Sequence, residues 1–311
     1  MRRQRPTQGF AAEPGFTLIE IAVVIVILSL LLAMIAGIAT AMLGQQRREA
    51  TRQRLAGVET AIALFVSQNQ RLPCPADGTR PGTDANAGKE NPDPPSGTCT
   101  GNQANGVVPW RALGLSEQDV TDGWGNRLSY RVSLDFVTRP AMNLTYCDPG
   151  GGKTSAEPLG SGGYCDSNCT SATFPGGCTA PAAVTSNRGL RVCNLSGSVV
   201  MNPTPGSAFS VENCSSAAAS PIPPSTGAAY VVISHGENGA GAYNNQGVLQ
   251  AATGTDSGTE EAKNAANLAL RTYYVDDFAS YPAGTGHFDD FVLRPSILTV
   301  ATKAQLGPRA H

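Results

Sequence analysis

Residues 13–43 read EPGFTLIEIAVVIVILSLLLAMIAGIATAML, and this stretch decides the fold class of the chain. Its last 23 residues, 21–43, contain no charged side chain. About 20 helical residues at ~1.5 Å each cross the hydrocarbon core of a bilayer, so the run predicts a transmembrane helix. The alternative is a secretory signal cut among the small residues near Thr40, although the apolar core of such signals is usually only ~7–15 residues long.

A short motif stands immediately before the uncharged run. Gly15 precedes Phe16, and the acidic Glu20 is the fifth residue after that glycine. This arrangement resembles the processing site of the type IV pilin and type II secretion pseudopilin superfamily. The resemblance implies that a prepilin peptidase removes residues 1–15 as a leader peptide on the cytoplasmic side. It also implies that the peptidase methylates the new N-terminus at Phe16.

Glu20 is the one charged side chain in residues 16–43. A carboxylate in a lipid-embedded helix is costly unless it has a partner. Cleavage after Gly15 would create an ammonium on Phe16, within one helical turn of Glu20 or beside the Glu20 of a neighbouring subunit. The resemblance implies that this pair sets the subunit register during assembly. A glutamate that only reaches toward the lipid headgroups is the alternative.

Basic residues flank the uncharged run on both sides. Cytoplasmic flanks of membrane spans are enriched in Lys and Arg, so the larger number of arginines after the run favours the opposite orientation to the processing motif. We give the motif more weight because its geometry is specific and because the later arginines lie on a continuing helix. The arginines are Arg2, Arg3 and Arg5 before the run, and Arg47, Arg48, Arg52 and Arg54 after it.

The helix is expected to continue beyond the membrane over residues 44–70. Apolar residues at helical spacing form a stripe there, and Arg71-Leu72-Pro73 ends the helix. We therefore divide the chain into a leader (1–15), a transmembrane and assembly helix (16–43), a periplasmic half of the helix (44–70) and a globular domain (71–311). The stripe consists of Leu55, Val58, Ile62 and Phe65, with Val66 beside them.

Strand patterns dominate the two ends of the globular domain. Residues 128–132 alternate like a half-buried strand after the turn 122–126, in which Trp124 is expected to anchor the core, and 229–234 and 291–294 are further strands. A short helix is expected over 260–270. The fold class is α+β, with a long N-terminal helix packed on an antiparallel sheet, and the order of elements resembles the major pseudopilins. Residues 146–225 form a loop-rich insertion with short strands near 190–192 and 198–201.

Eight cysteines are distributed over the globular domain, and an even number fits four disulfides. No histidine occurs in residues 1–234 and paired CxxC knuckles are lacking, so a zinc site is the weaker interpretation. An oxidising compartment favours disulfides, and Cys74 with Cys99 is the preferred pair because they flank one Pro- and Gly-rich loop. The candidates are Cys74, Cys99, Cys147, Cys165, Cys169, Cys178, Cys193 and Cys214.

One acidic region suggests calcium. The turn that follows residues 229–234 is rich in Gly and in oxygen donors, and two Asp pairs come later in the chain. Calcium takes six to eight oxygen ligands, and a calcium loop near the C-terminus is implied by the resemblance to major pseudopilins. A solvated acidic turn is the alternative. The candidate ligands are Glu237, Asn238, Asp276, Asp277, Asp289 and Asp290.

Composition argues against other functions. The net charge is -2, from 22 Lys and Arg against 24 Asp and Glu, so nucleic acid is not an expected partner. Three histidines are a thin supply for catalysis, residues 150–154 lack the full phosphate-loop pattern, and Ser234-His235 lacks a nucleophile elbow. We therefore expect no enzyme and no cofactor other than the candidate calcium.

The sequence as a whole predicts a structural subunit, a pilin or pseudopilin, of a type IV pilus or type II secretion fibre. Its size and its Cys-rich insertion suggest a minor or specialised subunit. The expected partners are prepilin peptidase, other pilin subunits, an inner-membrane assembly platform and the lipid bilayer. The expected location is the bacterial inner membrane, single-pass, with the C-terminal domain in the periplasm and later in a fibre. A fibre-tip adhesin that uses residues 146–225 and a signal-anchored extracytoplasmic enzyme stay open as alternatives.

Overall fold

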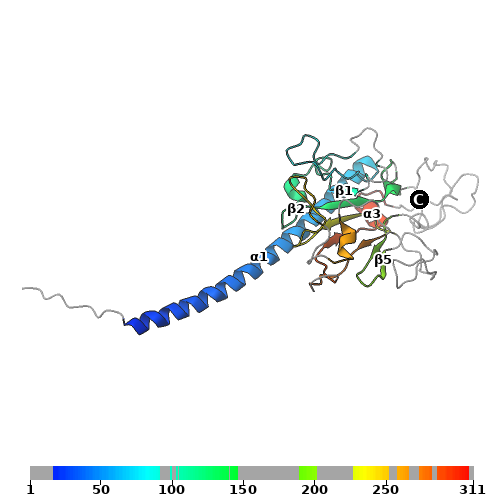
Figure 1. Ribbon diagram of the computed structural model, residues 1–311. Coiled ribbons are helices and arrows are strands. Elements are labelled where there is room, and N and C mark those ends of the chain that lie inside the picture. Colours follow the sequence, from blue (N-terminus) through cyan, green and yellow to red (C-terminus); the bar gives the residue numbers. More distant parts are fainter. Residues whose placement is uncertain are drawn as a thin grey trace, which may run out of the picture. The chain divides into compact units, whose positions relative to one another are not determined.

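The computed structural model consists of two compact units, Met1–Gln46 and Arg47–His311, which are described separately. The helix α1 (Leu18–Asn69) contributes residues to both (Figure 1). The structure describes residues 17–91, 99, 103, 105–139, 141–145, 189–201, 227–251, 258–265, 273–281 and 286–307.

The first unit is described over the part of α1 up to Gln46. The window Leu18–Ile35 has a mean hydropathy of 3.1 and none of it is buried. Among the described residues this is the one helix long and apolar enough to cross a membrane, by length and composition. Its large apolar side chains are exposed by 50% (Leu31) to 87% (Leu18). Continuous apolar surface of this extent marks contact with lipid or with other protein.

The centre of the second unit is a four-stranded antiparallel sheet in the order β1-β3-β6-β9. Its strands are β1 (Asn105–Val107), β3 (Ser129–Val132), β6 (Tyr230–Ser234) and β9 (Phe291–Leu293). In the register, Tyr130 lies opposite Gly106 on one side and opposite Val232 on the other.

Smaller ladders and turns complete the second unit. An antiparallel pair joins β2 (Asn126–Arg127) to β7 (Tyr243–Asn244). A three-stranded sheet has the order β5-β4-β8, in which β4 and β8 are parallel. Its strands are β5 (Val199–Met201), β4 (Val192–Cys193) and β8 (Tyr274–Val275). The remaining elements are η2 (Glu117–Val120), η3 (Leu134–Phe136), η4 (Glu261–Asn264) and α3 (Ile297–Lys303).

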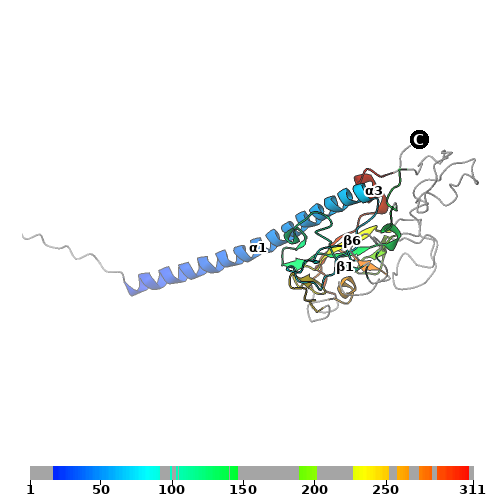
Figure 2. The ribbon, with the colours of Figure 1, turned by 90° about the horizontal axis from the view of Figure 1, so that it is seen from above.

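One face of the four-stranded sheet packs against α1 and α3 (Figure 2). Alternate strand residues point to one face of a sheet, and here Tyr130 and Val132 of β3 and Tyr230 and Val232 of β6 take that face. Lys303 of α3 forms an ion pair with Glu59 of α1, which fixes the two helices side by side. The shared core contains Leu55, Val58, Ile62 and Val66 of α1, Tyr130, Val132, Tyr230 and Val232 of the sheet, and Ile297, Val300 and Ala301 of α3.

The opposite face of the sheet is also buried, so the expectation that residues 128–132 form a half-buried strand is wrong. All four residues of β3 and all five of β6 are buried. A second apolar cluster, which includes Val192, Val231 and Tyr274, covers the face turned away from α1. Arg131 lies on this side with 1% exposure. Its guanidinium donates to the carbonyls of Gly106 and Ala265, so its charge is held inside the protein by oxygen acceptors.

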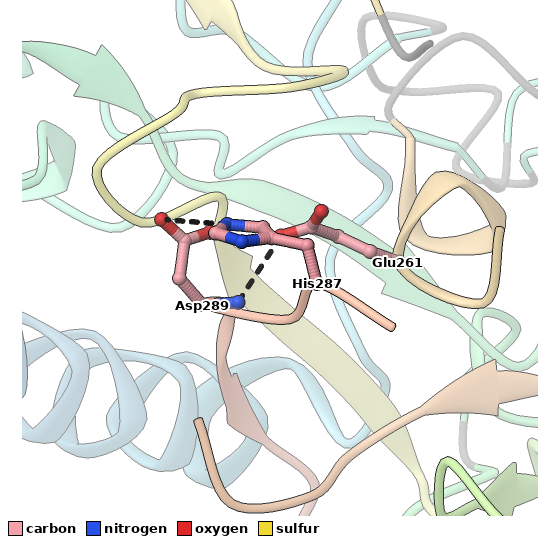
Figure 3. A group of neighbouring side chains, drawn as sticks. All are labelled: Glu261, His287 and Asp289. Carbon is pink, nitrogen blue, oxygen red and sulfur yellow. Dashed lines mark hydrogen bonds and ion pairs between the residues drawn. The ribbon is translucent and has the colours of Figure 1, made fainter. Parts of the chain in front are cut away.

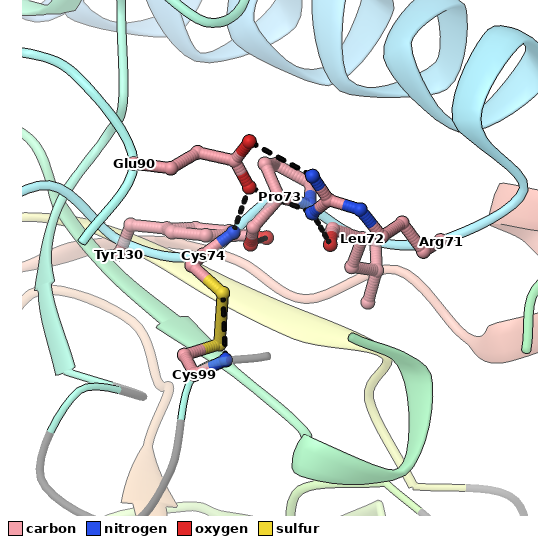
Figure 4. The surroundings of a disulfide bond; sticks show 7 residues. All are labelled: Arg71, Leu72, Pro73, Cys74, Glu90, Cys99 and Tyr130. Carbon is pink, nitrogen blue, oxygen red and sulfur yellow. Dashed lines mark hydrogen bonds and ion pairs between the residues drawn. A yellow bond between two sulfur atoms is a disulfide. The ribbon is translucent and has the colours of Figure 1, made fainter. Parts of the chain in front are cut away.

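The end of α1 is fixed by a compact group of polar contacts (Figure 4). The helix ends at Asn69, and Gln70 follows with a φ of 56°. Arg71 then binds Glu90 through two hydrogen bonds of 2.7 and 2.9 Å, and Glu90 also accepts from the backbone N–H of Cys74. Cys74 and Cys99 form the disulfide that the sequence favoured. These contacts hold the loop after the helix against the domain.

The turn 122–126 connects the sheet to α1. The Asp122 carboxylate accepts hydrogen bonds from the backbone of Trp124 and Asn126, which closes the turn. A Cβ on Gly123 would lie 2.3 Å from the carbonyl oxygen of Arg47, so only glycine allows this approach to the helix. Trp124 is half-buried and stacks at 5.9 Å from Phe291. Trp124 therefore packs near the edge of the core. The tryptophan that is buried inside the core is Trp110.

Part of the expected insertion is described. Residues 189–201 contain β4 and β5. The rest of 146–225 lies outside the described residues, as do residues 266–270 of the expected short helix. The described start of that segment is the 3-10 helix η4, Glu261–Asn264.

The packing of α1 on the sheet leads to a stability prediction. Ile62 is completely buried in this core, whereas Leu64, two residues further on, is 60% exposed. Ile62→Ala should lower the free energy of unfolding by about 2–4 kcal/mol, because it removes buried methyl groups and leaves a cavity. Leu64→Ala is the matched control and should change it by less than about 0.5 kcal/mol. Denaturant titration of the detergent-solubilised chain, followed by tryptophan fluorescence, measures both; equal effects would contradict this packing.

Candidate functional site

The first candidate site is the start of α1, where Thr17 and Glu20 bind each other. The Glu20 carboxylate accepts from the backbone N–H and the hydroxyl of Thr17, both at 2.8 Å. The backbone N–H of Glu20 donates in return to the Thr17 hydroxyl at 3.4 Å. This reciprocal pattern is a capping box, in which two side chains satisfy the free N–H groups at the start of a helix. Gly15 and Phe16, the predicted cleavage residues, lie outside the described residues.

The sequence analysis missed this role of Glu20. Thr17-Leu18-Ile19-Glu20 has the T-x-x-E spacing of a capping box, so the signal was present. The structure thus gives Glu20 a local partner in the same chain, in addition to the ammonium partner that the resemblance implies.

The helix that follows Glu20 presents an apolar surface with satisfied backbone groups. Ser29 is a polar residue in this segment, and its hydroxyl donates to the carbonyl of Val26 at 2.8 Å. In a lipid environment every polar group must be satisfied internally, and a continuous helix achieves this for the backbone. This segment is therefore suited to contact lipid or the apolar helices of other subunits.

The cysteine predictions fall into two groups. Cys74 and Cys99 are paired, and Cys193 is also disulfide-bonded. The five remaining cysteines, among which the partner of Cys193 must be, lie outside the described residues: Cys147, Cys165, Cys169, Cys178 and Cys214.

The six calcium candidates do not come together as one site. Asp276 forms an ion pair with Arg294, and the Asp277 carboxylate accepts from the backbone N–H of Leu195 at 3.0 Å. The side chain of Glu237 is exposed. Asp276 and Asp277 thus have partners of their own, and among the described residues neither belongs to the group of possible metal ligands around Asp289. Calcium binding itself stays a prediction.

A different cluster forms around Asp289. Its members are Glu261 of η4 and His287 and Asp289 of the segment before β9, and one ligand atom of each lies within 4.8 Å of the others (Figure 3). The sequence analysis did not join Glu261 and His287 to the acidic residues. His287 lies two residues before Asp289 in the sequence, but Glu261 joins them only through the tertiary structure, so sequence spacing could not have revealed the complete group.

The turn 235–238 supports this cluster from a second side. The backbone N–H groups of Glu237 and Asn238 donate to the Asp289 carboxylate at 2.7 and 3.1 Å. The Asn238 amide donates to both carboxylate oxygens of Glu261. Gly236 has a φ of 57°, and a Cβ there would lie 2.4 Å from the carbonyl oxygen of Asp289. The turn therefore needs glycine to sit this close to Asp289.

Burial controls the ionisation of the groups near the cluster. Burial, together with the neighbouring Asp289 carboxylate, raises the pKa of Glu261 to about 7. Burial and the negative charge of Glu261 raise the pKa of Asp290 well above its ordinary value. Burial and the charge of Arg131 lower the pKa of His235 to about 3, so this imidazole is neutral. The Nε2 atom of His235 shares a hydrogen bond of 2.8 Å with the Ser129 hydroxyl, which positions the ring.

The comparisons with known proteins concern the N-terminal segment. The family described as the prokaryotic N-terminal methylation motif, the signature of type IV pilins and pseudopilins, matches residues 12–36. The match includes Gly15, Phe16, Glu20 and the first part of the uncharged run, so the expected pilin-type motif is confirmed. No curated protein and no solved structure matches the chain.

The capping box gives a local prediction. Thr17→Val keeps the shape of the side chain but removes the hydroxyl, which should cost about 1 kcal/mol of helix stability at this end. Hydrogen exchange of the amides of residues 18–20 should then accelerate roughly fivefold in the uncleaved chain in detergent micelles. Thr17→Ser is the control, because it keeps the hydroxyl and should exchange like the unmodified chain. Equal exchange in the valine and serine variants would show that the box does not stabilise the helix end.

Proposed function

We propose that this chain is a structural subunit, a pilin or pseudopilin, of a type IV pilus or type II secretion fibre. The match of the N-terminal methylation motif to residues 12–36 is the observation that carries the proposal. A prepilin peptidase cuts after Gly15 and methylates Phe16. Residues 16–43 of the helix then anchor the subunit in the inner membrane, with residues 44–311 in the periplasm, until assembly.

The physical features of the chain support this proposal in two ways. The exposed apolar surface of Leu18–Ile35 suits a bilayer before assembly and a bundle of like helices afterwards. The globular unit carries disulfides, which persist in an oxidising compartment such as the periplasm. The work of the chain is accordingly assembly and not catalysis, and its partners are the peptidase, other subunits and the assembly platform.

The mature N-terminus provides the direct test. The full chain, expressed with a prepilin peptidase, should give a mature protein that starts with a methylated Phe16. Without the peptidase it should keep its leader. Mass spectrometry of the intact protein and of its N-terminal peptide distinguishes these forms. A mature start near Thr40 would instead identify an ordinary secretory signal and would refute the proposal.

Variants of the capping box separate the two roles of Glu20 in assembly. Glu20→Gln keeps a capping side chain but removes the charge, whereas Thr17→Val removes the cap and keeps the charge. If the carboxylate binds the Phe16 ammonium, Glu20→Gln should lower fibre yield at least about tenfold, equivalent to ~1.4 kcal/mol per subunit, and Thr17→Val should not. The measurement is the amount of sheared or crosslinked fibre relative to mature subunit in the membrane. The reverse pattern would mean that Glu20 acts through the helix cap.

A further inference from the structure

We propose that Glu261, His287 and Asp289 bind a divalent transition metal of the zinc type. The three side chains come from η4 and from the segment before β9, and they converge on one point (Figure 3). Such a site goes beyond assembly by the N-terminal helix. It differs from the calcium prediction in its residues and in its nitrogen ligand.

Two atoms of this group lack a partner although they are buried. Oδ1 of Asp289 and Nε2 of His287 are inaccessible to solvent and have no hydrogen-bond partner among the described residues. The side chains of Asp289 and His287 are only 4% and 12% exposed. Leaving buried polar atoms unpaired is costly, so each such atom in a native protein needs an explanation.

The separations within the group suit ligands of one ion. One ligand atom of each of the three side chains lies within 4.8 Å of the others. Nε2 of His287 lies 3.7 Å from Oδ2 of Asp289, which is too long for a hydrogen bond, and Oδ1 of the same carboxylate is the oxygen left without a donor. Two ligands that each lie about 2.1 Å from one zinc ion are separated by roughly 3.4 Å in tetrahedral geometry, so the side chains would move closer together on binding.

Charge gives a further reason for a cation. Glu261, Asp289 and Asp290 are exposed by 0%, 4% and 6%. Within the described residues, no Lys or Arg nitrogen lies within 4.0 Å of any of the three carboxylates. Buried acids are normally paired with a cation or coordinate a metal. Because burial raises the pKa of Glu261 and of Asp290, a divalent ion would bind in exchange for protons and would supply the positive charge that these carboxylates otherwise lack.

The surrounding hydrogen bonds already orient the ligands. Glu261 accepts four hydrogen bonds, two from the Asn238 amide and one each from the backbone N–H groups of Gly258 and Asp289, which fix the orientation of its carboxylate. A metal would take the place of one of the two Asn238 contacts. The turn 235–238 holds the other oxygen of Asp289 through two N–H groups. Metal ligands are typically oriented by such neighbours.

The imidazole selects the class of metal. Calcium and magnesium take oxygen ligands, whereas histidine nitrogen suits zinc and its neighbours in the first transition row. Three protein ligands, with water in the fourth position, form a known type of zinc site. The ion would tie η4 to the segment before β9, and through Asn238 to the turn after β6. It would stabilise this loop-rich region as a cross-link does.

The experiment measures metal content and melting temperature of the full chain in detergent, purified with a tag that contains no histidine. After chelator treatment and dialysis against Zn²⁺, we expect one zinc per chain by mass spectrometry and a melting temperature higher by about 5 °C at saturation. Co²⁺ should bind with the visible absorption of a site that contains nitrogen. His287→Gln should lose the bound metal and the rise in melting temperature.

Matched variants make the result decisive. Asp276→Asn removes a part-buried carboxylate outside the cluster. This variant should still bind one zinc per chain and show the same increase in melting temperature with zinc. Glu261→Gln should lose both the bound zinc and the rise in melting temperature. If Glu261→Gln fails to fold, His287→Gln still tests the site, because Nε2 of His287 makes no hydrogen bond in the described fold. Absence of stoichiometric zinc, or equal zinc in His287→Gln, would overturn the proposal. An equal rise with Ca²⁺ in both the unmodified chain and His287→Gln, with none from Zn²⁺, would also overturn it and would support an all-oxygen site.

Discussion

The second unit depends on one constraint: both faces of its central sheet are buried, so every charged group on the face away from α1 needs a partner inside the protein. Arginine meets this constraint twice. Arg131 donates to carbonyls of β1 and of the segment after η4. Arg127, which is completely buried, donates to Glu117 and to the carbonyls of Gly78, Arg80 and Asn245. One guanidinium thus orders three loops that have little regular structure of their own, because its five donors have a fixed geometry.

Buried carboxylates meet the need for internal partners differently. Asp122 is satisfied by the backbone of its own turn and by the Ser234 hydroxyl. Glu261, Asp289 and Asp290 instead gather with His235 and His287 and share backbone and amide donors. Both solutions depend on segments that lie far from each other in sequence. The polar interior therefore specifies how the loops are arranged, while the apolar face toward α1 supplies the ordinary core.

The features of this structure that are set by a short stretch of chain could be predicted from the sequence. The uncharged run 21–43, the stripe from Leu55 to Val66 and the end of the helix before Pro73 follow from composition and helical spacing. The Cys74–Cys99 pair could be favoured because both residues flank one loop. In these cases the signal and the structure lie within a short segment of chain.

The remaining features depend on contacts that sequence spacing does not report. The alternation of apolar and polar residues in 128–132 shows that β3 has two different faces. It does not show that a second group of residues covers the polar face as well. Asp276 and Asp277 were grouped with Asp289 by composition, yet the chain at the end of β8 turns them toward Arg294 and Leu195. Glu261 joins His287 and Asp289 only in the folded protein. The Thr17–Glu20 capping box was visible but was missed, because Glu20 was considered only as a charge in lipid.

The position of α3 has a consequence for the time at which the domain can fold. The apolar stripe of α1 lies early in the chain, but β9 and α3, residues 291–303, complete the sheet and the core beside it, and Lys303 binds Glu59 across that boundary. Contacts between segments so distant in sequence form late and slowly. The core around the stripe therefore stays incomplete until residues 291–303 have been synthesised, although β3 and β6, which also pack against the stripe, come earlier in the chain. Until then the helix face that α3 covers in the native domain remains exposed.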